Sequence, residues 1–388
     1  MNLSLDATVL RRALGAVKPL TTAKAPKNGV AHGLVLAVYP SGEVAILATN
    51  GDTFARLVVG QTAARTITPT GWALDVTGVK TLLSLLPKRG PVALTVGDGG
   101  GLAVNGSAVG VSEDNGAWPM FMVGGAPPLA LRAMATLDVA LDIDLASAVA
   151  DVCSTDETRY CLNGIFFDAD GSIVATDGHR MMVLAPGMGR RAHEAAVILP
   201  QVAWRVAAKA LSTMNISTDA DATWRVDAPP AWIVLHDGVS AVWSRAIEGR
   251  YPDWRQVLPA PNSLPSRVDV DVAELASTLK RHAAVSGGHT ATRCHVNGGL
   301  ALATTVGETA LNDVLPGART GPDGPPTGLN ATYLRDAAVT FAGFNAKCHV
   351  RLAMVDELSP FTLAPAPHPR GVEGGEYALT ALIMPMRI

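Results

Sequence analysis

The feature that most constrains this sequence is a threefold internal repeat. At three places a short alternating apolar strand ends in an aspartate and an apolar pattern of helical period follows, in "LSLDATVLRRALGAV" at Asp6, "LDIDLASAVADVC" at Asp144 and "VDVDVAELASTLKRHA" at Asp271. The aspartates lie 138 and 127 residues apart. An aspartate accepts hydrogen bonds from the first free amides of a helix, so each is expected to be an N-cap. The repeat predicts three similar structural units.

A second helix is expected inside each unit. "WALDVTGVKTLLSLLPK", "VILPQVAWRVAAKAL" and "TGLNATYLRDAAVTF" pass from strand to helix at Asp75, Pro200 and Asn330, which are residue types suited to a helix start. Between the helices, "LVLAVYPSGEVAILAT", "IFFDADGSIVAT" and "VALTVGDGGGLAVNG" have the alternation and turn residues of antiparallel hairpins. The glycine run in the last of these joins two strands, which favours a hairpin turn over a phosphate-binding loop.

Two segments rich in proline, glycine and serine separate the repeats, at residues 123–133 and 257–267. The sequence therefore predicts an α+β chain of three tandem domains, comprising residues 1–130, 131–262 and 263–388. In each domain two helices alternate with antiparallel hairpins.

Composition excludes several classes of protein. Hydrophobic residues make up 48% of the 388 residues and charged residues only 17%, which does not fit a disordered chain or a coiled coil. With 31 Lys and Arg against 34 Asp and Glu, a basic surface can arise only by segregation of charge. The four cysteines lack C-x-x-C spacing, so we expect reduced core residues in a cytoplasmic protein, with no metal and no cofactor. No signal peptide and no membrane span are expected.

One copy of the repeat carries residues that the others lack. Gly51, Gly178 and Gly307 recur at intervals of 127 and 129 residues, each after an apolar strand, which indicates a shared bulge or a close backbone approach. The pair His179–Arg180 follows only the second of these glycines. A feature present in one copy is a better functional candidate than one shared by all three.

Four motifs in order resemble one family. They are "TRYCLNGIFF", "VATDGHRMMV", "IEGRYPDWRQVLP" and the terminal "LIMPMRI", and together they resemble the bacterial DNA polymerase III beta subunit family, the DNA sliding clamps. The resemblance implies three clamp domains, each with two helices packed on two antiparallel sheets. It further implies that two chains join head to tail into a ring around duplex DNA, and that the protein is not an enzyme.

The resemblance also implies a cleft that binds short linear peptides of the replicative polymerase, the clamp loader and repair proteins. Methionines suit such a cleft because their flexible side chains adapt to different ligands. The expected cleft residues are Leu162, Thr176, Gly178, His179, Arg180, Met181, Pro252, Val257, Asn330, Tyr333, Leu358, Pro360, Leu382, Met384, Pro385, Met386 and Arg387.

Sequence-independent attraction to phosphates would come from basic residues on the helices and on one loop. The expected DNA-facing residues are Arg11, Arg12, Lys24, Lys80, Arg205, Lys209, Lys280 and Arg281. Two positions depart from the pattern of the family: Gln256 stands where a basic residue is frequent, and Asp156 stands where a neutral polar residue is frequent. The contact between chains is expected near residues 108–111 on one side and near Ala284 and Val285 on the other.

Two alternative functions remain open from the sequence. Asp177 and His179 are neighbouring acid–base groups, as in a hydrolase, although no third member or G-x-S-x-G motif accompanies them. A non-catalytic interaction scaffold built on the same repeat is the second alternative.

Overall fold

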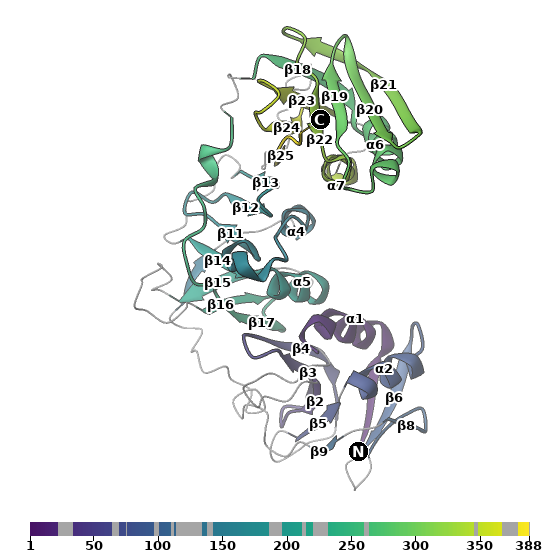
Figure 1. The fold of residues 1–388 in the computed structure, drawn as a ribbon. Helices are drawn as coiled ribbons and strands as arrows, with labels where there is room; N and C mark the ends of the chain where they lie inside the picture. The colour runs from purple at the N-terminus through teal and green to yellow at the C-terminus, as the bar shows by residue number, and fades with distance from the viewer. Residues whose placement is uncertain are drawn as a thin grey trace. The chain divides into compact units, whose positions relative to one another are not determined.

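The computed structural model describes residues 1–21, 34–63, 70–74, 76–96, 101–109, 112–113, 134–137, 143–185, 196–211, 215–219, 232–259, 264–344, 348–366 and 379–387. The chain divides into two compact units (Figure 1). Unit 1 contains residues 1–143 and 199–248, and unit 2 contains residues 144–198 and 249–388. The predicted domain boundaries, after residues 130 and 262, lie outside the described residues and stay predictions.

Unit 1 contains three α-helices among its described residues. Its elements are β1 (Asn2–Asp6), α1 (Ala7–Val17), η1 (Lys18–Leu20), β2 (Leu34–Val38), β3 (Glu43–Thr49), β4 (Thr53–Gln61), β5 (Thr70–Leu74), α2 (Val76–Leu85), β6 (Pro91–Val96), β7 (Leu102–Val104), β8 (Ser107–Val109), β9 (Ser112–Glu113), β10 (Met134–Leu137), α5 (Gln201–Ala210), β15 (Asn215–Asp219), β16 (Trp232–His236) and β17 (Ala241–Arg245).

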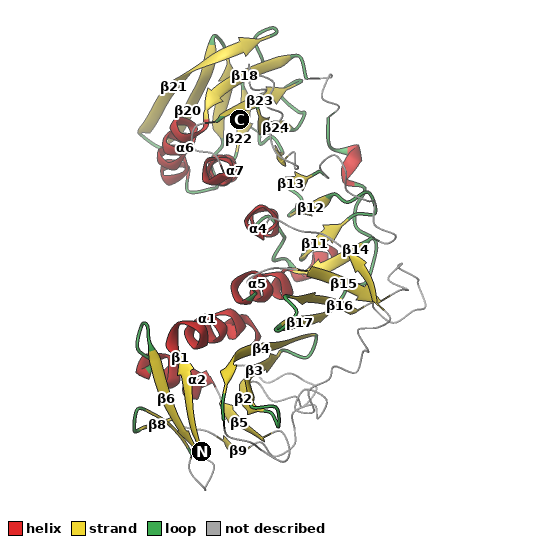
Figure 2. Cartoon of the chain, turned by 180° about the vertical axis from the view of Figure 1, so that it is seen from behind, coloured by secondary structure: helices red, strands yellow, loops and turns green. Residues whose placement is uncertain are grey.

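The strands of unit 1 form two antiparallel sheets. One has the order β1-β6-β7-β8 and the other β10-β15-β16-β17-β4-β3-β2-β5-β9. The pairing of β4 with β17 joins strands from the first and second sequence repeats, and we call it the first junction. Helices α1 and α5 lie side by side against the nine-stranded sheet, and α2 contacts a strand of each sheet (Figure 2).

Unit 2 also contains three α-helices among its described residues. Its elements are α4 (Ile143–Ala150, whose first residue belongs to unit 1), η3 (Glu157–Leu162), β11 (Gly164–Phe167), β12 (Ile173–Thr176), β13 (Arg180–Leu184), β14 (Val197–Pro200, at the division between the units), η4 (Trp254–Gln256), β18 (Ser266–Asp271), α6 (Val272–Ser286), β19 (Thr292–Val296), β20 (Gly299–Val306), β21 (Thr309–Thr320), β22 (Thr327–Leu329), α7 (Ala331–Phe344), β23 (His349–Met354), β24 (Phe361–Pro365) and β25 (Leu379–Ile383).

The strands of unit 2 form one antiparallel sheet with the order β14-β11-β12-β13-β25-β24-β23-β18-β21-β20-β19-β22. The pairing of β13 with β25 joins strands from the second and third repeats, and we call it the second junction. Helices α6 and α7 pack on each other, and α6 also covers β18, β20 and β21. Mixed helices and antiparallel sheets of this kind confirm the predicted α+β class.

All six predicted helices are present, and most begin as the capping residues indicate. Asp6 accepts from the amides of Thr8 and Val9, and Asp271 accepts from the amide of Glu274. Asn330 does the same for α7, and α5 begins directly after Pro200. The prediction for Asp144 is wrong, because α4 begins at Ile143 and Asp144 lies inside its first turn. At that position the carboxylate interacts favourably with the positive end of the helix dipole, but it is not the N-cap. Asp75 lies outside the described residues.

The predicted hairpins are present as the pairs β2–β3, β11–β12 and β6–β7, although residues 97–100 between the last two strands are not described. The recurring glycines occupy hairpin turns and not bulges. Gly51, Gly178 and Gly307 connect β3 to β4, β12 to β13 and β20 to β21, with φ values of +99°, +90° and +59°. Glycine is preferred there because other residues seldom adopt positive φ.

No disulfide joins the four cysteines. Cys153 and Cys294 are buried, as expected for core residues, and burial raises the pKa of the Cys294 thiol to about 12. Cys161 and Cys348 are only partly buried. Within the described part of the chain, none of the helices has the length and apolar character required to cross a membrane.

Candidate functional site

The second junction brings the one-copy motif beside the end of the chain. Strand β13 pairs antiparallel with β25, and Arg180 lies opposite Ile383. Beyond β25 the backbone amide of Met384 donates to the carbonyl of His179 at 2.8 Å, and the amide of Met386 donates to Gly328 at 2.7 Å. Residues separated by about two hundred positions in sequence therefore lie within one hydrogen bond of each other.

The turn before β13 is held by the carboxylate of Asp177. One oxygen accepts from the backbone amides of His179 at 2.9 Å and Arg180 at 3.0 Å, and the other accepts from Nε of Arg180 at 3.0 Å. Gly178 has a φ of +90°, a conformation that other residues seldom adopt, so the turn favours glycine at this position. Asp177 thus has a structural role, and the geometry does not support the hydrolase alternative.

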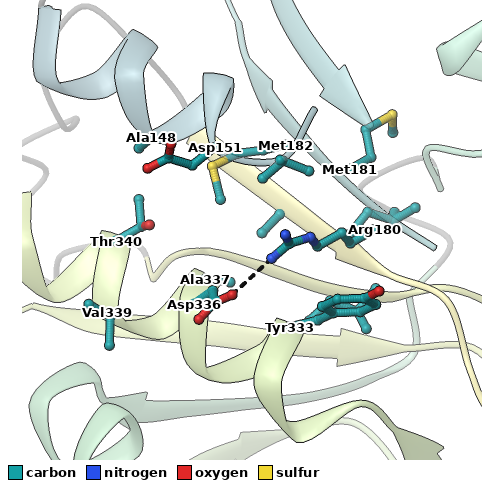
Figure 3. A pocket seen from close by; sticks show the side chains of 14 residues that line it. Ala148, Asp151, Arg180, Met181, Met182, Tyr333, Asp336, Ala337, Val339 and Thr340 are labelled. Carbon is teal, nitrogen blue, oxygen red and sulfur yellow. Dashed lines mark hydrogen bonds and ion pairs between the residues drawn. The ribbon is translucent and has the colours of Figure 1, made fainter. Parts of the chain in front are cut away.

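The guanidinium of Arg180 is enclosed by three groups. It pairs with Asp177, and its Nη1 donates to Oδ2 of Asp336 on α7 at 3.0 Å (Figure 3). It also lies over the ring of Tyr333, 4.5 Å from the ring centre. Arg180 therefore links β13 to α7 and is not a loose charge at the rim of a cleft. Sequence reasoning missed Asp336, whose only signal was an acid one helical turn after Tyr333 in "YLRD".

Burial raises the pKa of Tyr333, and the carboxylate of Asp177 adds to this effect while Arg180 opposes it. With a pKa above the ordinary value of 10, the phenol is protonated at neutral pH, as any tyrosine is, and it can donate a hydrogen bond to a ligand.

A cavity of about 340 Å³ lies on the α7 side of the second junction. Its walls come from the end of α4 and from β13, α7 and β25, with Ala148, Asp151, Val152, Arg180, Met181, Met182, Tyr333, Asp336, Ala337, Val339, Thr340, Ala381, Leu382 and Ile383 as lining residues (Figure 3). In Figure 3 the side chain of Met182 points into this space, whereas that of Met181 points away. Met182 was not among the expected residues. Successive side chains of a strand point to opposite faces of the sheet, and the sequence did not indicate which of the two methionines faces the cavity.

The pleat of the sheet divides the expected cleft residues between two faces. Arg180 faces α7, so Met181 and its neighbours across the sheet, Thr176 and Leu382, lie on the opposite face. Met181 and Leu382 are buried, as is Leu162. Two other expected residues, Val257 and Leu358, are 44% and 79% exposed, an unusual state for large apolar side chains. Met384, Pro385 and Met386 are half-buried, and Gly178, His179, Pro252 and Arg387 are exposed.

The segment "YPDWRQV" is fixed by aromatic and charged contacts. Tyr251 stacks on Phe166 with a ring separation of 4.6 Å. The indole of Trp254 donates to Asp168 at 2.9 Å, and Arg255 pairs with Asp168 and lies over the Trp254 ring. These contacts hold Pro252 and Val257 at the surface. Asp168 was missed because its partners are more than eighty residues away in sequence.

The expected residue Asn330 and the departing residue Gln256 both have local structural contacts. Besides capping α7, the side chain of Asn330 donates to the carbonyl of Gly288 at 3.0 Å, which fixes the start of the helix that carries Tyr333. Gln256 donates to Asp253 at 3.0 Å. Pro360 is half-buried beside the exposed turn that carries Leu358.

The expected DNA-facing residues fall into two groups. Lys80, Arg205, Lys209 and Lys280 are exposed on α2, α5 and α6, and the guanidinium groups of Arg11, Arg12 and Arg281 donate hydrogen bonds to protein groups. Lys24 lies outside the described residues. Asp156 caps η3, and its bonds to Thr158 lower the pKa of its carboxyl group, so it carries a negative charge at neutral pH.

Comparison with known proteins gives the same family throughout. The family model for the central domain of the DNA polymerase III beta subunit matches residues 142–253. The beta sliding clamp of Escherichia coli K12 is 33% identical over 106 residues, which are 26% of this chain and 27% of that protein. The beta sliding clamp of Caulobacter vibrioides is 29% identical over 246 residues, 61% of this chain and 60% of that protein. These sequence matches therefore cover less than two thirds of each relative.

Solved structures match over the whole length. The beta subunit of the DNA polymerase of Streptococcus pyogenes has a TM-score of 0.76 at 18% identity, and each chain is covered completely. The beta subunit of DNA polymerase III from Thermotoga maritima has a TM-score of 0.75 at 17% identity, with 100% of this chain and 99% of that chain covered. The resemblance seen in the motifs is confirmed: residues 142–253 match the family model for the central domain of the DNA polymerase III beta subunit, and the chain as a whole has the fold of the solved beta subunits.

Proposed function

We propose that this chain is a DNA sliding clamp, a non-catalytic processivity factor. Two copies close head to tail around duplex DNA in the cytoplasm, and a cleft beside the end of the chain binds short linear peptides of the polymerase, the clamp loader and repair proteins.

The second junction carries this proposal. Its backbone bond from Met384 to His179 assembles the Asp-Gly-His-Arg turn, the terminal methionines and Tyr333 in one place. Met181 and Leu382, which lie opposite each other on neighbouring strands, are buried, as is Leu162, and two other expected residues, Val257 and Leu358, are exposed apolar side chains. Exposed apolar side chains around a partly buried methionine surface are typical of sites that bind varied peptides.

Free sheet edges support assembly from two copies. Strand β8 is the last strand of its sheet, and residues 309–316 of β21 pair with β20 on one side while their other side is unpaired among the described strands. An unpaired edge can add a strand from another chain. Of the expected contact region, Ala108 belongs to β8, and Ala284 is exposed in the last turn of α6.

Retention on circular DNA tests the proposal. The protein is incubated with nicked circular duplex, ATP and the clamp loader of the same organism, and the complex is isolated by gel filtration. A clamp stays on the circle and is lost when the DNA is linearised, whereas an ordinary DNA-binding protein stays on both forms. Sedimentation at micromolar concentration should give about twice 40.2 kDa, and a strict monomer or a trimer would contradict the ring.

A further inference from the structure

The basic residues of the helices are unevenly divided between the two units. Within their helical bounds α1, α2 and α5 contain five basic residues and no acidic residue, and the five are Arg11, Arg12, Lys80, Arg205 and Lys209. The bounds of α4, α6 and α7 contain three basic and three acidic residues, which are Lys280, Arg281, Arg335, Asp144, Glu274 and Asp336. The helices of unit 1 are thus strongly positive and those of unit 2 are neutral.

Two arginines of α1 join the helices of unit 1 into one layer. Nη1 of Arg11 donates to the carbonyls of Leu83 and Leu86 at the end of α2, both at 2.9 Å. Arg12 donates to the carbonyl of Ala210 at the end of α5. Helix C-termini carry partial negative charge and unpaired carbonyls, so a guanidinium is a favourable cap for each. Helix α1 therefore lies between α2 and α5 (Figures 1 and 2).

Several cations of this layer are exposed to solvent. Arg205 and Lys209 are exposed and four residues apart, so they share one face of α5, and Arg12 reaches the end of that helix next to Lys209. Lys80 is exposed on α2, and Lys18, Lys88 and Arg89 are exposed just beyond the helix ends.

Two of the three basic residues within the helices of unit 2 pair with neighbouring acids. Arg281 pairs with Asp313 at 3.0 Å, and Arg335 pairs with Asp336. Asp144 and Asp151 are exposed at the two ends of α4. A phosphate that approached these helices would meet as much repulsion as attraction.

We infer that the layer of α1, α2 and α5 is the principal phosphate-binding surface of the chain and that α4, α6 and α7 add little net attraction for DNA. The inference rests on the proposed clamp function, since duplex DNA is the polyanion that such a protein encloses. Attraction between basic side chains and phosphates does not depend on the base sequence, so it allows a protein to move along the duplex.

Two double variants of matched composition test the division. Arg205→Gln with Lys209→Gln removes one arginine and one lysine from α5, and Lys280→Gln with Arg281→Gln removes the same two residue types from α6. Binding to a short linear duplex is measured as a function of salt. We expect the α5 variant to bind roughly tenfold more weakly and its salt slope to fall by about 2 per chain, since each lost phosphate contact lowers the slope by about 0.9. The α6 variant should change the affinity by less than about twofold.

The charge-conserving variant Arg205→Lys with Lys209→Arg should keep the wild-type affinity, which separates charge from packing, and thermal unfolding of all variants verifies that they fold. If the α6 variant lost as much duplex affinity as the α5 variant, or more, the inference that α1, α2 and α5 form the principal phosphate-binding surface would be overturned. Retention of the wild type on circular DNA would still support the clamp function in that case. Absence of duplex binding by the wild type together with absence of retention would overturn both proposals.

Discussion

The two junctions have the same backbone and different side chains. At the first, Asn50 Oδ1 accepts from the amides of Asp52 and Thr53 around Gly51, and β4 then pairs with β17. At the second, Asp177 accepts from His179 and Arg180 around Gly178, and β13 then pairs with β25. The residue that opens the new strand is Thr53 in one case and Arg180 in the other.

This difference changes what each junction can do. Thr53 is fully buried and bonds to Ser244 at 3.0 Å, and Phe54 and Trp243 pack into a closed core cluster with Val35 and Leu47. Arg180 is too long and too polar to be enclosed in that way, so it extends to Asp336 and Tyr333 and a cavity remains beside it. One repeated scaffold thus yields a sealed contact and a candidate binding site through substitutions at a few positions.

The largest effect is expected from removal of a large buried side chain at the first junction, which should lower the free energy of unfolding. Trp243 is 6% exposed, and Trp243→Ala should lower the free energy of unfolding by about 3–5 kcal/mol because a large cavity replaces the indole. Urea denaturation measures the change. Val239→Ala is the control, since Val239 is 60% exposed in the turn before the same strand. Equal shifts for both variants would show that the first junction is not a packed core.

The next largest effect is expected from removal of the last five residues, which should weaken peptide binding at the second junction and leave the first junction unchanged. Deletion of residues 384–388 removes the bond from Met384 to His179 and the apolar terminal side chains. Affinity for a polymerase-derived clamp peptide, measured by calorimetry, should fall at least about 100-fold, or about 2.7 kcal/mol. The protein should still sediment as a dimer. An unchanged affinity would refute the assignment of the cleft.

A smaller effect is expected when Arg180 of the second junction is replaced by threonine, the residue type found at the equivalent position 53 of the first junction. Arg180→Thr removes the pairs with Asp177 and Asp336 and the contact with Tyr333. Because these groups are partly exposed, we expect a loss of about 1–2 kcal/mol in the free energy of unfolding. Peptide affinity should fall several-fold because Tyr333 loses its support.

Arg335→Gln is the matched control for that change. It removes the other guanidinium on Asp336 but keeps the pair between Arg180 and Asp336. If Arg335→Gln weakened peptide binding as much as Arg180→Thr, the support of Tyr333 would not depend on Arg180.

The smallest effect concerns pH. The pKa of Tyr333 is raised above the ordinary value of 10, chiefly by burial, so its phenol stays protonated as the pH rises to that value. Peptide affinity at the second junction should therefore be constant between about pH 7.5 and 9.5. A decline of affinity in this range that is absent from Tyr333→Phe would show that the phenol ionises earlier and would contradict the buried environment.

Much of the fold was predictable because its signals are local. A capping side chain bonds to amides two or three residues ahead, so Asp6, Asp271 and Asn330 marked helix starts correctly. The failure at Asp144 has the same origin, since a carboxylate one position inside a helix resembles a cap in sequence. Recurrence of Gly51, Gly178 and Gly307 located three turns, but sequence did not distinguish a turn from a bulge.

The candidate site was predictable only in part. The resemblance named Arg180 and Tyr333, but it did not indicate that Asp336 binds the guanidinium of Arg180 that lies over the Tyr333 ring. Likewise it named Met181 without Met182, although the two residues face opposite sides of one strand. The expected excess of basic residues on the helices holds for α1, α2 and α5 and fails for α4, α6 and α7.

The sequence by itself determined the repeat, the six helices with most of their starts, and the one copy that carries His179 and Arg180. These follow from spacing, periodicity and hydrogen bonds between near neighbours. Only the tertiary structure decided that β13 would pair with β25, which groups Arg180 binds, and which cations remain exposed on the helices. Those outcomes depend on contacts between residues tens to hundreds of positions apart, and no local pattern encodes which distant partner a strand edge or a guanidinium will meet.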